Sequence, residues 1–430
     1  MPKAQPIAAL ALTRHLLCAS AVLIIACGSS GGGEGEPAAQ AGSAAIAGTS
    51  STASGGSVAA GGSGNAAGGS GNAAGTSATT GGTSSGGTTS TSGAMGGAAA
   101  VAGAGGIKPA GDLWVAPDGN DANPGSEAQP LLNLPNALAR ITAGFTIWLK
   151  AGTYSYKNVI QIKKSGTMAA GYTIAAAPGT RPTVNFAGSP AATRGFDLQG
   201  DYWHFLGFEV ENATDNCIAI AGSHNTIENM TIHGCGDTGL QITVSSANVA
   251  DNTRGAYNLV LNTDSYENFD AATGGENADG FAAKLRIGPG NVFRGCRAYN
   301  NSDDGWDFFA ADDVVEIDGS WAFLNGKGVS GNNPAGDGNG FKLGGKPTSA
   351  GEGGAVHLVK DSFAFENLAC GYTQNNNPDV PKLSNCGAKD NGNSDYCGTL
   401  SRSGSATMTM TGAQAKAVKR NADGSLPPMK

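Results

Sequence analysis

Three segments of this chain repeat at a fixed separation of 66 residues. Residues 224–242, 290–308 and 356–374 align without a gap, and apolar residues and glycines meet at equivalent positions. A segment of this length cannot bury its apolar side chains alone, so repeats of this kind stack into a solenoid. Because one coil of a three-sided parallel β-helix takes about 22 residues, we interpret each period as three such coils.

Short apolar strands separated by Gly, Asn and Asp turns fill the rest of this region, for example at residues 203–210 and 226–232. No helix-length periodic segment interrupts them, which leaves no room for βαβ crossovers. A jelly roll or a sandwich with coincident Gly-rich turns is the alternative fold. Ahead of the repeats, the spacing of Leu134, Leu138 and Ile141 predicts a short helix, which we expect to cap the first coil.

A glycine followed by an apolar or aromatic residue recurs five times and marks the register of the predicted coils. The residue after this marker glycine is expected to point inward and the next one outward, because side chains alternate along a strand. Equivalent positions on successive coils then stack about 4.8 Å apart. The five pairs are Gly239-Leu240, Gly280-Phe281, Gly305-Trp306, Gly340-Phe341 and Gly371-Tyr372.

Four aspartates come together in this register and predict a calcium site. Asp279 and Asp304 each directly precede a marker glycine. Asp303 lies one residue earlier, and Asp307 lies two residues after its glycine, on the outward face. Four unpaired carboxylates this close would repel one another, whereas Ca²⁺ prefers such oxygen ligands. The alternative is that each Asp caps the backbone of its own Asp-Gly turn.

Lys342 is the candidate catalytic base. It lies two residues after Gly340, which is the outward position that Asp307 takes after Gly305. The longer gap between these two glycines fits one coil plus a loop insertion at residues 327–337. A lone outward lysine is usually only solvated, but this position puts Lys342 on the same face as the aspartates.

A carboxylate-bound cation beside an amine suits elimination from a uronate sugar. The cation would stabilise the charge that develops on the sugar carboxylate when the neighbouring carbon loses its proton, and a neutral lysine would accept that proton. Lysine is ordinarily protonated at neutral pH. A divalent cation lowers its pKa and carboxylates raise it, so we expect an alkaline optimum.

The segments that carry these residues resemble the family nine polysaccharide lyases, over about residues 112–425. The resemblance implies a right-handed parallel β-helix and Ca²⁺-dependent cleavage of polygalacturonate (pectate). It implies Asp279, Asp303, Asp304 and Asp307 as calcium ligands and Lys342 as the base; for Lys284 we infer a contact to a neighbouring substrate carboxylate. The matching segments are residues 264–268, 278–284, 288–291, 295–298, 301–307 and 339–342.

Three other functions stay open at this point. An inverting β-helix polygalacturonase would use paired carboxylates, for which Asp303 and Asp304 are candidates. The chain could instead be a lyase for another polyuronate, or a surface lipoprotein that binds polysaccharide through calcium without catalysis.

The first 27 residues are interpreted as an export signal. Lys3 and Arg14 supply positive charge, and residues 16–26 form an apolar run that is too short to span a membrane. The end of this run resembles a bacterial lipobox, with Cys27 as the lipidated residue; an ordinary signal peptide cleaved near Ala26 is the alternative. We therefore expect a secreted or cell-surface protein, an outer-membrane lipoprotein that touches the membrane only through this anchor.

Residues 28–111 are expected to be a disordered tether before a β-helix domain at residues 112–430. Within the tether, residues 37–107 contain no charged side chain and consist almost wholly of Gly, Ala, Ser and Thr. Such a segment has too little apolar surface to offset the entropy of ordering. The net charge of −8 and the lack of a basic patch exclude nucleic acid as a partner, and we expect a monomer.

Six cysteines follow the leader. Cys386 and Cys397 flank a Gly-, Asn- and Asp-rich loop, and we predict a disulfide between them, which export permits. The other four can instead be small residues buried in the core. No Cys-x-x-Cys pair or Cys/His cluster in the sequence points to zinc.

Overall fold

The computed structural model describes residues 111–244, 254–327, 336–345 and 354–429. The predicted leader with Cys27 lies outside the described residues, and so does the predicted tether apart from Gly111. Both therefore stay predictions.

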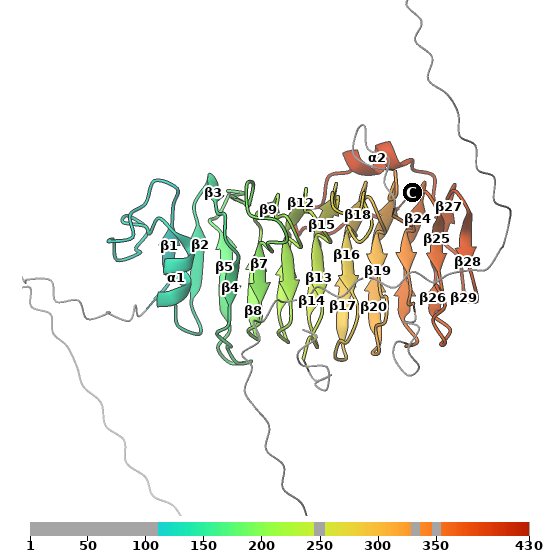
Figure 1. Ribbon diagram of the computed structural model, residues 1–430, viewed down its shortest axis with the longest axis horizontal. Helices are drawn as coiled ribbons and strands as arrows, with labels where there is room; N and C mark the ends of the chain where they lie inside the picture. Colours follow the sequence, from blue (N-terminus) through green and yellow to red (C-terminus); the bar gives the residue numbers. More distant parts are fainter. Residues whose placement is uncertain (1–110, 245–253, 328–335, 346–353, 430) are drawn as a thin grey trace, which may run out of the picture. The chain divides into compact units, whose positions relative to one another are not determined.

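The described strands form a parallel β-helix with three sheets, as predicted. Each strand from β2 to β26 pairs in parallel with the third strand further along the chain, so the chain visits the three sheets in turn. Figure 1 shows the strands stacked side by side along the β-helix.

The first sheet has eleven strands. They are β1 (Leu113–Val115), β2 (Thr146–Leu149), β5 (Tyr172–Ala176), β8 (Trp203–Leu206), β11 (Thr226–Glu228), β14 (Leu259–Leu261), β17 (Asn291–Arg294), β20 (Val315–Asp318), β23 (Leu358–Lys360), β26 (Lys382–Ser384) and β29 (Ser401–Ser403). The second sheet has nine strands. They are β4 (Ile160–Ile162), β7 (Phe196–Leu198), β10 (Ile218–Ile220), β13 (Leu240–Ile242), β16 (Phe281–Ala283), β19 (Trp306–Asp307), β22 (Phe341–Lys342), β25 (Cys370–Thr373) and β28 (Ser394–Cys397).

The third sheet also has nine strands. They are β3 (Thr153–Ser155), β6 (Thr183–Asn185), β9 (Glu209–Glu211), β12 (Thr231–His233), β15 (Asp264–Tyr266), β18 (Arg297–Tyr299), β21 (Trp321–Phe323), β24 (Phe363–Phe365) and β27 (Gly387–Lys389).

The period of 66 residues spans two coils, so the prediction of three coils is wrong. Ile227 pairs with Val260, which pairs with Phe293. Phe293 in turn pairs with Ile317, which pairs with Val359. The residues matched in the sequence do lie at equivalent positions on the coils. They are separated by two coils rather than by the three that were predicted.

Turn length is the physical reason for this error. Coils of 22 residues exist from β7 to β13, where Phe196, Ile218 and Leu240 pair in turn. Coils on either side of these keep the same three strands but lengthen one of the turns, as between β13 and β14. A longer surface turn costs little free energy and leaves the strand register unchanged, so a repeat length does not determine a coil count.

Stacked aromatic rings fill the interior beneath the second sheet. Phe281, Trp306, Phe341 and Tyr372 pair in register on four successive strands and are fully buried. Their ring centroids lie 4.8–5.0 Å apart. These are the residues that follow the marker glycines, so the predicted inward direction is confirmed.

One end of the β-helix and one of its outer faces are covered. Helix α1 (Leu134–Arg140) buries Leu134, Ala137 and Leu138 against the first coils, which confirms the predicted cap. Helix α2 (Gly412–Ala417) lies over the third sheet (Figure 1), where Ala415 joins the aromatic residues of β21 and β24 in a second cluster. This second cover was not predicted.

A ladder of asparagines runs through one turn of five successive coils. Each side-chain amide donates to the amide oxygen of the next residue in the ladder at 2.9 Å. All but the last are buried, so the ladder satisfies polar groups that the turns would otherwise bury unpaired. The ladder consists of Asn268, Asn301, Asn325, Asn367 and Asn391.

The predicted Cys386–Cys397 disulfide is wrong. Cys397 bonds to Cys370 instead, and this disulfide links the neighbouring strands β28 and β25 of the second sheet. Cys386 precedes β27 of the third sheet and is a buried free thiol whose Sγ contacts the carbonyl of Val359. A second disulfide joins Cys217 and Cys235, and Cys296 is a buried free thiol.

Candidate active site

The strand register brings the predicted base and one predicted ligand side by side. Ala282, Asp307 and Lys342 are direct partners on β16, β19 and β22 of the second sheet. Their inward neighbours are the stacked aromatic residues, so all three point outward. In the preceding turns, the amide of Gly280 donates to the carbonyl of Asp304 at 2.9 Å, which places Asp279 and Asp304 on adjacent coils.

The carboxylates of Asp279, Asp303 and Asp304 form a group that could hold a metal ion. One carboxylate oxygen of each lies within 4.8 Å of the others, and all three residues are buried. Asp307 is buried beside them, since Lys284 Nζ lies 3.3 Å from Asp279 Oδ2 and 3.4 Å from Asp307 Oδ2. The structure therefore brings all four predicted ligands together.

Hydrogen bonds from neighbouring coils hold these carboxylates in place. Asp303 accepts from the amides of Asn277 and Asp337, at 3.0 and 2.7 Å. Asp304 Oδ1 accepts from the amide and the side chain of Asn339, at 2.6 and 2.9 Å. These donors lie well outside the Asp-Gly turn itself, so simple capping of the turn does not account for either residue.

Burial and mutual repulsion make the group electrostatically unfavourable. Burial raises the pKa of Asp279 and of Asp304 well above the ordinary value, and the neighbouring carboxylates raise both further against the opposing effect of a lysine. The pKa of Asp303 is raised too, again chiefly by burial. Among the described residues, the buried Asp304 Oδ2 faces the amine of Lys342 at 3.2 Å.

Lys342 supplies one amine to this group. Its Nζ lies 3.2 Å from Asp304 Oδ2, 3.3 Å from Asp337 Oδ2 and 3.9 Å from Asp307 Oδ1. Burial alone would lower the pKa of Lys342, but the surrounding carboxylates raise it well above its ordinary value. Sequence reasoning placed Lys342 correctly on this face.

Sequence reasoning missed Asp337 as a contact of Lys342. The residue lies at the end of the insertion that was noted between the two marker glycines, and it is 62% exposed. An acidic residue within this insertion was the available signal. Its position next to Lys342 is a tertiary contact that no local pattern in the sequence indicates.

Lys284 lies inside the carboxylate group. Its side chain is only 5% exposed and pairs with Asp279 and Asp307. A contact with a substrate carboxylate, as inferred from the sequence, would require this amine to turn away from both partners.

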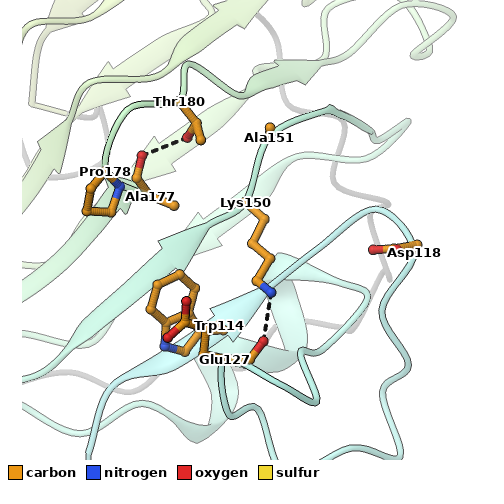
Figure 2. A pocket seen from close by; sticks show the side chains of 8 residues that line it. All are labelled: Trp114, Asp118, Glu127, Lys150, Ala151, Ala177, Pro178 and Thr180. Atoms are coloured by element: carbon orange, nitrogen blue, oxygen red, sulfur yellow. Dashed lines mark hydrogen bonds between the residues drawn. The ribbon is translucent and has the colours of Figure 1, made fainter.

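A pocket of about 670 Å³ lies elsewhere, on the N-terminal coils (Figure 2). Trp114, Lys150, Ala177 and Pro178 are among its lining residues, and Lys150 Nζ donates to the carbonyl of Glu127 at 2.7 Å. The carboxylate group on the second sheet forms no part of this lining, so this pocket and the candidate chemistry are separate.

Comparison with known proteins identifies the family. Residues 113–409 match the family described as Pel9A-like, right-handed β-helix region. The chain belongs to this Pel9A-like family. The prediction of a family nine polysaccharide lyase is thereby confirmed, and with it the right-handed sense of the β-helix.

Two pectate lyases are about two fifths identical to this chain over the residues that align. Pectate lyase L of Paenibacillus polymyxa is 41% identical over 288 residues, which cover 65% of this chain and 63% of that protein. Pectate lyase L of Dickeya dadantii is 38% identical over 320 residues, which cover 69% and 72%. The chain thus spans less than two thirds of the Paenibacillus protein.

A solved Pel9A-like structure supports the same assignment. The crystal structure of pectate lyase Pel9A is 34% identical and superposes with a TM-score of 0.64, covering 75% of this chain and 89% of that chain. A rhamnogalacturonan lyase at 21% identity and a TM-score of 0.59 shares the fold. Within the described residues, the helices are all too short or too polar to cross a bilayer.

Proposed function

We propose that this protein is a calcium-dependent pectate lyase that cleaves polygalacturonate by β-elimination. The observation that carries the proposal is the position of one amine, Lys342 Nζ, 3.2 Å from a buried carboxylate oxygen of Asp304 within a group of four aspartates. The pectate lyases among the relatives support polygalacturonate as the substrate.

The four aspartates fit Ca²⁺ by the chemistry of their donor atoms. The site offers carboxylate oxygens, which Ca²⁺ prefers, and no imidazole or thiol is found among its described residues. Burial and mutual repulsion raise the pKa values of three of the aspartates against the opposing effect of Lys284 and Lys342. A divalent cation held by Asp279, Asp303, Asp304 and Asp307 would stabilise their charged forms.

Lys342 is the proposed base. When bound, the calcium ion would supply the positive charge that stabilises the sugar carboxylate as the neighbouring C5 loses its proton. The Nζ lone pair of neutral Lys342 takes that proton, and the C5–H electron pair becomes the C4–C5 double bond. The bond from C4 to the glycosidic oxygen breaks, and this oxygen leaves with its electron pair and is protonated from solvent.

Lys284 is proposed to position the site. Its buried amine holds Asp279 and Asp307 at fixed distances and offsets part of their charge. A direct contact between Lys284 and a neighbouring sugar carboxylate, as the sequence suggested, is the second role we assign to it, and it needs a rotation of the side chain on substrate binding.

One assay separates a lyase from a hydrolase or a binding protein. The full chain is incubated with polygalacturonate, with calcium and then with an excess of chelator, and near-ultraviolet absorbance is followed. We expect absorbance from the new double bond with calcium and none with chelator. Products without this absorbance would indicate a hydrolase, and no products on any polyuronate would indicate a binding protein.

The first prediction concerns Lys342→Ala. We expect catalysis to fall by about 10²–10⁴-fold while calcium-dependent binding to polygalacturonate is retained. Lys342→Arg should stay inactive, because a guanidinium keeps its proton. Lys360→Ala is the matched control, since Lys360 is an outward lysine of the first sheet, paired with Glu316. Equal activity of Lys342→Ala and the parent protein would rule out Lys342 as the base.

We also propose export and lipid attachment at Cys27, which rest on the sequence alone. The full chain should incorporate labelled fatty acid when produced in a bacterial host, and Cys27→Ala should not. Secretion without any label would favour an ordinary signal peptide cleaved near Ala26.

A further inference from the structure

A second group of metal-binding side chains lies on the third sheet, on strands that contribute nothing to the carboxylate site of the second sheet. Glu209 and Glu211 come from β9, and His233 comes from the adjacent strand β12. Glu211 and His233 are direct partners in the strand register, and Glu209 lies two residues before Glu211 on the same outward face. All three are half-buried, so the group is open to solvent.

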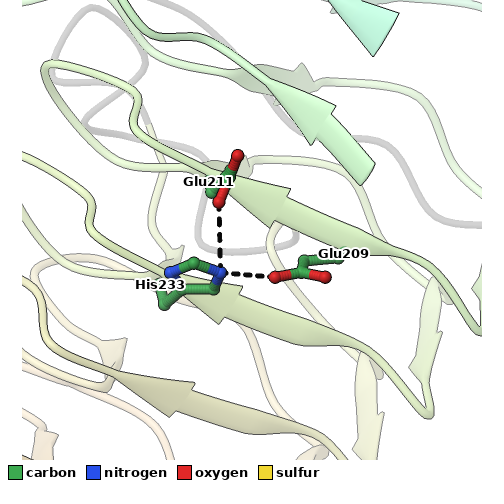
Figure 3. A group of neighbouring side chains, drawn as sticks. All are labelled: Glu209, Glu211 and His233. Atoms are coloured by element: carbon green, nitrogen blue, oxygen red, sulfur yellow. Dashed lines mark hydrogen bonds and ion pairs between the residues drawn. The ribbon is translucent and has the colours of Figure 1, made fainter. Parts of the chain in front are cut away.

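The imidazole points between the two carboxylates (Figure 3). His233 Nε2 lies 2.5 Å from Glu209 Oε1 and 3.3 Å from Glu211 Oε2, and all three ligand atoms lie within 4.8 Å of one another. A tetrahedral Zn²⁺ with bonds of about 2.0–2.1 Å sets its ligand atoms about 3.3 Å apart. Glu211 already meets this spacing, and Glu209 meets it after a shift of about 0.8 Å.

Neighbouring side chains orient each ligand from behind. Glu211 Oε1 accepts from Asn185 Nδ2 at 2.5 Å, and Glu209 Oε2 accepts from Thr183 Oγ1 at 3.4 Å. Each carboxylate therefore has one oxygen held by β6 and the other directed at the imidazole. The ring of His233 stacks on Tyr266 at 4.9 Å and 3°, which fixes its plane. Such supporting contacts are typical of metal ligands.

We propose that Glu209, Glu211 and His233 form a binding site for a transition-metal ion of the zinc class, distinct from the calcium site. One imidazole with two carboxylates suits zinc and its neighbours, whereas calcium takes oxygen ligands alone. Three protein ligands leave a fourth position for water. The bound ion links two successive coils, β9 and β12, and so stabilises the third sheet.

A neighbouring pair in the same molecule offers a matched control. His204 Nε2 lies 2.9 Å from Glu228 Oε2 on strands β8 and β11 of the first sheet. This pair has the same histidine–glutamate contact but a single carboxylate. A simple ion pair explains it fully, and it should bind zinc weakly or not at all.

The test is calorimetric titration of the calcium-saturated full chain with zinc chloride. Excess calcium keeps zinc away from the four aspartates. We expect one zinc ion per chain, and the double variant Glu209→Gln/Glu211→Gln, which keeps one of the three ligands, should lose this binding. His204→Asn/Glu228→Gln should bind like the parent protein. Zinc should also raise the thermal unfolding temperature of the parent protein but not that of the double variant.

A variant of the imidazole gives a second test that does not depend on the glutamate variants. His233→Asn removes the nitrogen ligand and should abolish zinc binding in the same titration. The proposal is overturned if the parent protein takes up no zinc, if the double variant binds it unchanged, or if the control variant loses it equally. None of these results would bear on lyase activity.

Discussion

The amine of Lys342 is surrounded by more negative charge than one lysine neutralises. Asp304, Asp307 and Asp337 all lie within 3.9 Å of it. A base must give up its proton before it can accept another, and each of these carboxylates favours the protonated amine. A cation bound to the aspartates would act in the opposite direction, which explains why an amine in this setting could serve as a base at all.

A charge-removing variant at Asp337 tests this balance. Because the carboxylates raise the pKa of Lys342 well above its ordinary value, the neutral fraction grows as pH rises, and activity should rise on the alkaline side. Asp337→Asn removes one carboxylate 3.3 Å from Nζ, so the rise in kcat/KM should move to lower pH. The measurement is a pH–rate profile at saturating calcium. An optimum on the acid side in the parent protein would contradict the role of Lys342.

The buried imidazole of His357 should make the stability of the fold sensitive to acid. Burial lowers its pKa from 6.5 to about 4, while the unfolded chain binds a proton near pH 6.5. The unfolded state therefore binds more protons between these values, and stability that is fully present above pH 6.5 is lost as pH falls towards 4, by about 3 kcal/mol. Chemical unfolding between pH 7 and 4 measures this loss.

The matched variant is His357→Asn. His357 Nδ1 accepts from the amide of Val315 at 3.2 Å, and its Nε2 is buried without a partner in the described structure. Asn291 accepts from the amide of Asn258 in the same way, so an asparagine can replace this contact. The variant should lose the His357 part of the acid sensitivity; an unchanged pH dependence would show that another group is responsible.

At the scale of the element, strand alternation orients the side chains of the core and the site, whereas side-chain ladders hold the turns. The strands are mostly three residues long, too short to be stable without their neighbours on adjacent coils. Alternation sends the aromatic residues of the second sheet inward and leaves Asp307 and Lys342 outward. Side chains hold the turns between strands instead, as the asparagine ladder does over five successive coils.

Asn325 is the central residue of that ladder. Its side chain donates to Asn367 and to the carbonyl of Ala298, and it accepts from Asn301. Asn325→Ala should lower the free energy of unfolding by about 1–3 kcal/mol for each buried group left unpaired. Asn391→Ala, at the less buried end, should cost less. Denaturant unfolding compares the two, and equal small losses would show that water replaces the ladder.

At the scale of the whole molecule, calcium bound to the four aspartates should affect both activity and the stability of the fold. A ligand that binds only the folded state stabilises it, by about 2.7 kcal/mol at 100 times its Kd. Thermal unfolding of the full chain should therefore shift upward with calcium and downward with chelator. Asp303→Asn should reduce this shift, and Glu316→Gln, an acidic residue on the first sheet, should retain it. A shift that survives in Asp303→Asn would place the stabilising calcium elsewhere.

The sequence by itself determined which residues lie at equivalent positions on successive coils of this protein. Alternation along a strand and the recurring glycine are local properties, so they placed the aromatic residues inward and Lys342 in line with Asp307 before any coordinates. The same register grouped the four aspartates, the family resemblance implied them as calcium ligands, and the structure brings their carboxylates together. A repeat that matches residue for residue must also share its strand register, which made the β-helix predictable.

Only the tertiary structure decided what depends on the length of the turns. The number of coils per repeat, the pairing of Cys397 with Cys370 and the contact of Asp337 with Lys342 all follow from how far each turn extends before the next strand. The Glu209, Glu211 and His233 group likewise exists because one turn brings β12 beside β9. Because the length of a turn changes at little cost in free energy, no local sequence pattern predicts it.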